Sequence, residues 1–208
     1  MTDQDRAARL RAAPLPTRRR FVRAAPALLL GLAAPSLARA LTATPQHAEG
    51  PFYPKTLPAD RDWDLTLFDG QAAPGEVMEM VGRVFAVSGA PIAGAAVEIW
   101  HCDPNGVYAH IGRKAAANFQ GYGALRTARD GAYRFRTTRP GVYPGRPRHI
   151  HVKARAEGFW PLTTQMYFPE TEGDWDGAFW ARTSLGSLIA KREAGEPPRY
   201  RFDMVLGG

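Results

Sequence analysis

The sequence predicts an all-β protein, a single antiparallel β-sandwich with long loops and little helix. Residues 76–208, which we assign to the sandwich domain, contain about six short segments that are rich in Val, Ile and aromatic residues or that alternate apolar with polar residues. Strands with one buried face have this pattern. Gly, Pro and Asp separate the segments at short intervals, which is typical of turns between antiparallel strands.

The first 40 residues form a segment that we expect to be removed from the mature protein. Residues 17–23 are rich in arginine and include a twin-arginine signature, the apolar run 24–37 follows, and Ala-Arg-Ala at 38–40 ends it. This order predicts a leader for the twin-arginine pathway and a periplasmic or secreted protein. The alternative is a membrane anchor, but the run is shorter than the ~20 apolar residues of a span, so we expect no stable anchor after cleavage.

The positive charge of the chain belongs mainly to this leader. Residues 1–40 carry eight Arg and two Asp, a net charge of +6, and the whole chain carries +7. The mature protein is therefore close to neutral, which argues against nucleic acid as a partner. A single cysteine, Cys102, excludes an internal disulfide framework; because it lies in an apolar run, we expect a buried, inert thiol.

Residues 41–75 are expected to form an extended arm that lies on the domain. The stretch contains five prolines and shows no clear period, a composition that disfavours regular elements. Within it, residues 49–54 are a cluster of aromatic residues and prolines that we expect to pack on the domain.

The sandwich domain is predicted to begin with two strands, at residues 77–87 and 95–102. Residues 88–91 mark the turn between them, and Asp-Pro-Asn-Gly directly after the second is a strong turn signal. Residues 111–125 have no clear period, so we interpret them as a long loop of the kind that carries function.

Four further strands are predicted in the second half of the chain. In residues 132–138 aromatic residues alternate with arginines, and in residues 149–156 Ile, Val and Ala alternate with His, Lys and Arg. Both patterns have the two-residue period of a strand. Segments 162–168 and 199–206 complete the set, and residues 183–194 are expected to form a short helix.

His149 and His151 form a His-x-His pair. On a strand both imidazoles would project from the same face, with Cβ atoms ~7 Å apart, so they can converge on one metal ion. Lys153 stands where a His-x-His-x-Asp zinc hydrolase has its Asp, which argues against that class. Tyrosines can supply anionic ligands instead. A free phenol has a pKa near ~10, so a strongly Lewis-acidic ion such as ferric iron is required to hold phenolates at neutral pH.

Five motifs carry a resemblance to a known family. They are Gly94 to Trp100, Asn105 to Tyr108, Pro140 to Pro144, Arg146 to His151 and Thr164 to Phe168. In this order and spacing they resemble the intradiol ring-cleavage dioxygenases, the family of catechol and protocatechuate dioxygenases. The resemblance covers roughly residues 48–170, and the fold it implies is a prealbumin-like β-sandwich.

The resemblance implies a non-haem dioxygenase with one Fe(III) ion per chain. The protein ligands would be Tyr108, Tyr143, His149 and His151, and Tyr143 would be the ligand displaced when substrate binds. The implied partners are a small aromatic diol and O₂. The ring would open between the two hydroxyl groups and give a muconate-type dicarboxylic acid.

Three further residues match the family's substrate pocket or its surroundings. Arg146 matches the arginine that stabilises negative charge developing on the ring, a large electrostatic effect in a water-poor site, so Tyr143 and Arg146 are candidate catalytic residues. Gln165 matches a pocket glutamine, and Trp100 is expected to wall the cavity. The alternatives are that Arg146 pairs with a surface carboxylate and that Trp100 belongs to the sandwich core.

Departures from the family pattern leave the substrate open. The interval from Tyr143 to His149 is shorter than in better-known members, and Gly145 stands where the protocatechuate enzymes have a tryptophan. The helical dimerisation segment of the catechol enzymes is absent, so whether the chain forms a homo-oligomer also stays open.

Two other functions are compatible with parts of the sequence. Segments 82–100 and 130–143 also resemble prealbumin-like and carboxypeptidase-regulatory-type sandwich modules, which bind without catalysis. Those modules need neither the His-x-His pair nor the two tyrosines, so the set of four ligands favours the enzyme. An iron-containing protein that binds catechols or siderophores without turnover would keep all four.

Overall fold

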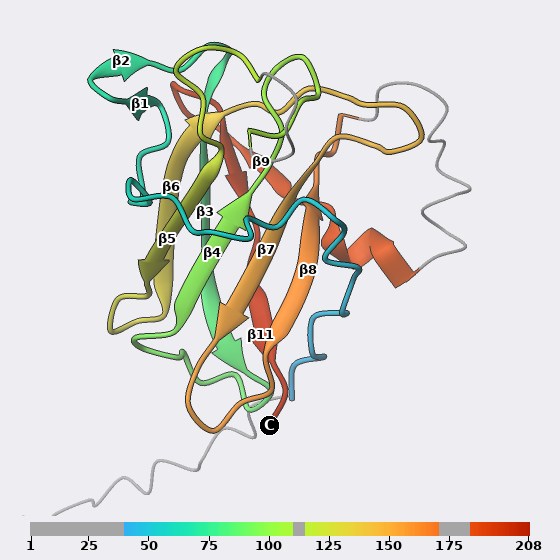
Figure 1. The fold of residues 1–208 in the computed structure, drawn as a ribbon. Coiled ribbons are helices and arrows are strands. Elements are labelled where there is room, and N and C mark those ends of the chain that lie inside the picture. Colours follow the sequence, from blue (N-terminus) through green and yellow to red (C-terminus); the bar gives the residue numbers. More distant parts are fainter. Residues whose placement is uncertain (1–39, 110–114, 171–183) are drawn as a thin grey trace, which may run out of the picture. The chain divides into compact units, whose positions relative to one another are not determined.

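The computed structural model of this chain describes residues 40–109, 115–170 and 184–208. The elements of these ranges lie in the unit Leu37–Gly208. Figure 1 shows that its main strands form two sheets packed face to face. The predicted all-β sandwich with long loops is confirmed.

The first sheet has four strands and is antiparallel throughout. In spatial order they are β5 (Tyr122–Arg126), β4 (Ala96–Trp100), β7 (His149–Arg155) and β8 (Leu162–Tyr167). The register sets His151 opposite Trp100 on one side and opposite Gln165 on the other. Directly opposite residues share a face of a sheet, so these three side chains form a row across its outer face.

The second sheet has five strands: β3 (Val77–Ala86), β6 (Ala132–Thr138), β9 (Lys191–Glu193), β10 (Arg199–Arg201) and β11 (Met204–Leu206). Both β10 and β11 pair with β3 in parallel, whereas β6 pairs with it antiparallel. The segment predicted as one strand at 199–206 is broken at Phe202 and Asp203. Phe202 lies so close to β3 that a Cβ at Gly82 would stand 2.1 Å from its carbonyl oxygen, so this crossing requires glycine.

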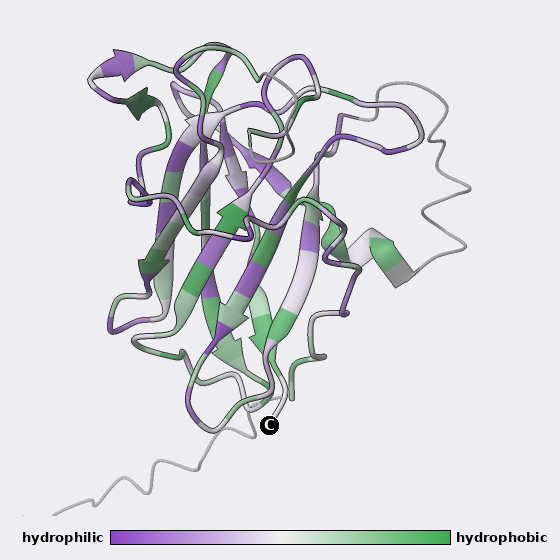
Figure 2. Ribbon diagram, in the orientation of Figure 1, coloured by the Kyte–Doolittle hydropathy of each residue, from purple (hydrophilic) through white to green (hydrophobic). Residues whose placement is uncertain are grey.

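The core fills the space between the two sheets. Val97, Ile99, Ile150 and Val152 enter it from the first sheet and are fully buried. Alternation along β4 and β7 directs the intervening polar residues to the outer face, and Figure 2 shows the resulting bands of hydrophobic and hydrophilic residues. The second sheet contributes the buried residues Met78, Met80, Val84, Phe135 and Met204.

Two elements lie in segments for which no strand was predicted. The end of segment 111–125, predicted as a loop, belongs to the strand β5, which pairs with β4 along its whole length. Within the predicted arm, β1 (Leu67–Phe68) and β2 (Gln71–Ala72) form a hairpin. Asp69 and Gly70 between them both have positive φ, 50° and 71°, as the Asp-Gly turns that match the twist of a hairpin require.

The short helix predicted for residues 183–194 is present only over its first part, as a 3₁₀ helix, and is wrong for residues 191–193. A 3₁₀ helix, η1, spans Ser184–Leu188, and β9 follows it. Residues 191–193 form a strand because β9 pairs with β10, and Glu193 also accepts a hydrogen bond from Arg201. Among the described residues no helix is long and apolar enough to cross a membrane.

The arm runs across the outer face of the first sheet. Figure 1 shows its blue-to-cyan trace passing in front of β7 and β8. The arm pairs with the edge of β8, since the His47 amide donates to the Thr163 carbonyl (2.8 Å). Further along the arm, the Arg61 carbonyl accepts a hydrogen bond from the Ala124 amide of β5 (2.9 Å). The arm therefore covers the face from which His149 and His151 project.

On the outer face of the second sheet, Glu79 is a buried carboxylate held by two arginines. Arg199 donates to it from Nε (3.0 Å) and Nη2 (2.8 Å), and Arg134 pairs with the other oxygen. Burial by itself raises the pKa of this carboxyl, but the hydrogen bonds from Arg199 and Arg134 outweigh burial, and the pKa lies below its ordinary value of 4.5. A carboxyl with a lowered pKa in the folded state stabilises the fold above its ordinary pKa, and this stability is lost as the pH falls through the folded-state pKa.

We expect Glu79→Gln to lower the free energy of unfolding at pH 7 by roughly 1 kcal/mol, at the low end for charged hydrogen bonds because both arginines are about half exposed. The gap between the two proteins should close as the pH falls below about 4.5. Urea unfolding at a series of pH values measures it. Asp130→Asn, which breaks the exposed pair with Arg83, is the control; a Glu79→Gln effect that did not change with pH would contradict the assignment.

Candidate metal centre

Two tyrosines and two histidines from three parts of the chain meet at one point. The Tyr143 hydroxyl lies 3.2 Å from Nε2 of His149, this nitrogen lies 3.2 Å from Nε2 of His151, and that nitrogen lies 3.1 Å from the Tyr108 hydroxyl. His149 and His151 come from β7, Tyr108 from the segment after β4 and Tyr143 from the loop before β7. The structure thus brings together all four residues that the sequence singled out as ligands.

A tight turn presents Tyr143 and Arg146 together. Tyr143-Pro144-Gly145-Arg146 has Pro at the second and Gly at the third position, as type II turns favour, and Gly145 has φ +78°. The Arg146 amide donates to the Tyr143 carbonyl at 3.3 Å. Gly145 is therefore required by the turn, and a Cβ built there meets nothing within 4 Å.

Tyr108 is presented by a loop that one carboxylate organises. The buried Asp103 side chain accepts hydrogen bonds from the amides of Asn105 (2.9 Å), Val107 (2.8 Å) and Ala116 (2.7 Å). These bonds close the turn that the Asp-Pro-Asn-Gly sequence predicted. Tyr108 follows directly and is 2% exposed, so its hydroxyl is fixed.

The hydrogen bonding of His149 fits a bound cation. Nδ1 of His149 donates to the Pro147 carbonyl (2.6 Å), which leaves a lone pair on Nε2 facing the cluster, as in metal sites where a carbonyl fixes the tautomer. Nε2 of His151 faces the same point. Donor atoms bonded at about 2.1 Å to one ion would lie about 3.0–3.4 Å apart. The three neighbouring pairs of donor atoms here are 3.1–3.2 Å apart.

The protonation states agree with this interpretation. Burial lowers the pKa of His149 to about 4 and that of His151 to about 2, so both imidazoles are neutral, the form that binds metals. Burial also raises the pKa of Tyr108 and of Tyr143, so a strong Lewis acid is needed to convert them to phenolates. Within the described ranges no three His, Cys, Asp or Glu side chains group around a point. The two imidazoles and two phenols are the candidate donors.

Aromatic side chains stack on two of the four donor residues, His151 and Tyr108. Trp100 is fully buried and its ring lies parallel to that of His151, with centroids 4.7 Å apart. We therefore interpret Trp100 as a support for His151 rather than as a cavity wall that substrate contacts. Phe52 of the arm stacks on Tyr108 at 4.3 Å. From its sequence, Phe52 was predicted only to belong to a cluster that packs on the domain, because no local pattern links it to a residue 56 positions away.

Arg146 and Gln165 lie together beside the four donors. Nη2 of Arg146 donates to Oε1 of Gln165 (2.5 Å) and to the Tyr167 hydroxyl (3.4 Å). Arg146 is half-buried and makes these contacts instead of the surface ion pair that was its alternative. Tyr167 was not predicted, although its place two residues after Gln165 on β8 puts it on the same face.

Nearby cations on the same face are paired. Lys153 lies 2.7 Å from Glu49 of the arm, and Arg155 pairs with the buried Glu98. Glu98 also accepts a hydrogen bond from Tyr53 of the arm (2.6 Å). The positive charge that follows the His-x-His pair is thus balanced by carboxylates and does not oppose a cation at the cluster.

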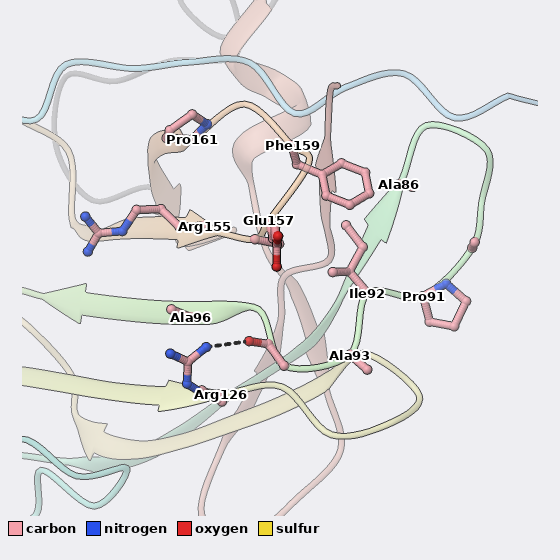
Figure 3. Close-up of a pocket in the computed structure, with 13 residues that line it drawn as sticks. Ala86, Pro91, Ile92, Ala93, Ala96, Arg126, Arg155, Glu157, Phe159 and Pro161 are labelled. Carbon is pink, nitrogen blue, oxygen red and sulfur yellow. Dashed lines mark hydrogen bonds between the residues drawn. The ribbon is translucent and has the colours of Figure 1, made fainter.

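A separate groove lies at the opposite ends of β4 and β7. It has a volume of about 790 Å³ and is bounded by the turns at residues 90–94 and 156–161. Figure 3 shows Arg126 at its edge, hydrogen-bonded to the Gly94 carbonyl (2.9 Å). None of the predicted site residues lines it, so the groove is not part of the metal centre.

Comparisons with known proteins show which family the chain resembles. A family model described as dioxygenase matches residues 48–208. The chain is 34% identical over 169 residues to catechol 1,2-dioxygenase 2 of Acinetobacter lwoffii (72% of this chain, 60% of that protein), and 34% identical over 174 residues to the protocatechuate 3,4-dioxygenase beta chain of Burkholderia cepacia (73% of each). The chain thus spans less than two thirds of the catechol relative.

A solved structure gives the same result. The dioxygenase domain of a dioxygenase–carbohydrate-binding protein fusion from Streptomyces sp. SirexAA-E superimposes with a TM-score of 0.64 at 32% identity, over 80% of this chain and 99% of that chain. An intradiol ring-cleavage dioxygenase from Tetranychus urticae has a TM-score of 0.65 at 20% identity and covers 80% of this chain and 95% of that one. The second likeness concerns the fold alone.

Loading the metal-free protein with Fe(III) tests the donor set. We expect a visible phenolate-to-iron absorption band, which Tyr108→Phe and Tyr143→Phe each shift and weaken because one phenolate is lost, with metal affinity lowered at least 10-fold. Absorption spectroscopy and metal analysis measure both effects. Tyr53→Phe removes a hydroxyl that bonds to Glu98 and should leave the band unchanged; a band insensitive to both ligand changes would refute the assignment.

Proposed function

Because this chain belongs to the intradiol dioxygenase family, we propose that it is a non-haem iron dioxygenase for catechol-type substrates. It opens the aromatic ring between the two hydroxyl groups, incorporates both atoms of O₂ and yields a muconate-type dicarboxylic acid. The observation that carries this proposal is the convergence of two phenol oxygens and two imidazole nitrogens within 3.1–3.2 Å of their neighbours.

The proposed cofactor is one Fe(III) ion per chain, held by Tyr108, Tyr143, His149 and His151. When bound, a ferric ion supplies the Lewis acidity that keeps phenolates deprotonated and draws electron density from a bound catecholate. Two phenolates and one hydroxide balance its three positive charges, so the centre can be neutral in a buried site. The two neutral imidazoles, and two phenols that need a strong Lewis acid to become phenolates, fit this ion.

The two tyrosines have different freedom to move. Tyr108 is 2% exposed and stacked on Phe52, whereas Tyr143 is half-buried in a loop whose next two residues are exposed. We therefore assign Tyr143 as the group that leaves the cluster and accepts a proton from a substrate hydroxyl, and Tyr108 as the fixed donor.

Arg146 is proposed to stabilise negative charge on the substrate. Its guanidinium is held by Gln165 and Tyr167 beside the tyrosine–histidine cluster, where a pre-oriented cation costs no reorganisation as charge develops. Gln165 acts through Arg146, whose orientation it fixes. This role is compatible with the place in the substrate pocket that the resemblance implies for Gln165.

The substrate class follows from the relatives and from the donor set. Relatives are named for catechol, chlorocatechol and protocatechuate, all of them aromatic 1,2-diols. The chain spans 60% of the first catechol relative and 57% of a chlorocatechol relative. We therefore propose the diol class and leave the ring substituent to experiment.

A product assay tests the proposed reaction. Iron-loaded protein is supplied with catechol, protocatechuate and hydroxyquinol in parallel under air. We expect consumption of one O₂ per diol and release of a muconate-type diacid from at least one of them, because the cluster and Arg146 are assembled. O₂ electrodes and mass spectrometry of the products measure this. Diol binding without any diacid would replace the enzyme by a catechol-binding protein.

We further propose export through the twin-arginine pathway to the periplasm or the exterior. The arginine-rich stretch and apolar run within residues 1–40 support it, and a route that carries folded proteins suits one that acquires its metal first. Replacing Arg18 and Arg19 by lysine should leave the protein in the cytoplasm. Immunoblots of cell fractions measure this, and unchanged export of the double variant would rule the pathway out.

A further inference from the structure

His47 of the arm reaches the side chains that hold Arg146. It pairs with the edge of β8 through its amide, which donates to the Thr163 carbonyl at 2.8 Å. Gln46 fastens the same stretch, since its side chain accepts from the Thr163 amide (2.8 Å) and donates to the Pro161 carbonyl (2.7 Å). The position of His47 is therefore set by strand-like pairing rather than by its own side chain.

Arg146 depends on two acceptors on β8. Its Nη2 donates to Oε1 of Gln165 and to the hydroxyl of Tyr167. The Tyr167 hydroxyl in turn donates to Oε1 of Gln165 at 2.8 Å. These three side chains form a closed triangle, in which the orientation of the Gln165 amide and of the Tyr167 hydroxyl decides where the guanidinium points.

The arm determines both orientations. Nε2 of Gln165 donates to the Ala48 carbonyl at 2.8 Å, which turns Oε1 toward Arg146. The Tyr167 proton is used in its short bond to Gln165, so the contact of Tyr167 with Nε2 of His47 (3.4 Å) requires the imidazole to donate. His47 and Ala48, which are consecutive in the arm, thus fix Tyr167 and Gln165 respectively.

We propose that His47 is a positioning residue for Arg146: its Nε2–H orients the Tyr167 hydroxyl, and through it the guanidinium that stabilises charge on the substrate. The inference rests on the proposed function for the role of Arg146, but the geometry that it concerns exists without metal or substrate. It assigns to the arm a part in the reaction besides covering the sheet.

The test compares three variants. His47→Phe keeps a ring and removes the donor, His47→Gln restores an N–H near the position of Nε2, and Gln46→Ala loosens the same stretch without touching the triangle. In metal-free protein, the rate at which phenylglyoxal modifies Arg146 is followed by peptide mass spectrometry. In iron-loaded protein, kcat and KM are measured with the diol that is cleaved most rapidly. Arg146→Gln shows how far kcat falls when the guanidinium is absent.

We expect His47→Phe to raise the modification rate of Arg146 and to lower kcat roughly fivefold with KM within twofold, as for loss of one hydrogen bond that matters in the transition state. His47→Gln should restore both values. Gln46→Ala keeps His47 and its amide bond to Thr163, so it should raise the modification rate of Arg146 less than His47→Phe does. An unchanged Arg146 rate in His47→Phe, no rescue by His47→Gln, or an equal effect of Gln46→Ala would each overturn the role. If the wild-type protein cleaves no diol, the proposed function fails, while the modification rates still decide the positioning of Arg146.

Discussion

The hydrogen-bonded register of β7 between β4 and β8 is the constraint on which the metal centre depends. It holds Trp100, His151 and Gln165 in one row across the outer face of the sheet. A slip of one residue would turn both imidazoles into the core and bring Ile150 and Val152 out. Burial of those two residues, worth about 1.5–3 kcal/mol each, therefore also keeps the histidines on the outer face.

A sheet face alone would leave the centre open to water, and the arm supplies the cover. Phe52 stacks on Tyr108, and a Cβ at Gly50 would lie 3.5 Å from Cε1 of His151. Glu49 balances Lys153 with an ion pair of 2.7 Å. Since charges interact more strongly where water is excluded, the arm contributes to the chemistry of the site as well as to its shape.

Local sequence patterns could predict much of the fold and part of the site. Alternation in β7 put His149 and His151 on one face, and Asp-Pro-Asn-Gly indicated the turn before Tyr108. Contacts between distant segments could not be predicted, because they leave no local pattern in the sequence. The parallel pairing of β10 and β11 with β3 depends on where the end of the chain meets the second sheet. The stacking of Phe52 on Tyr108 depends on the path of the arm. The helix predicted at 183–194 is limited to a 3₁₀ turn at 184–188, because pairing of residues 191–193 with β10 outweighs a weak local preference. The Asp69-Gly70 hairpin could have been found, since Asp-Gly is a strong turn signal.

The alternation of β7 also separates two physical demands within one strand. Ile150, Val152 and Ala154 contact the core, while His149 and His151 belong to the candidate metal centre. Conservative changes at the first set alter stability with little change in the donor geometry, and changes on the outer face leave the core packed. A lineage could therefore modify its chemistry on this face without losing the sandwich, or gain thermal stability without changing its substrate.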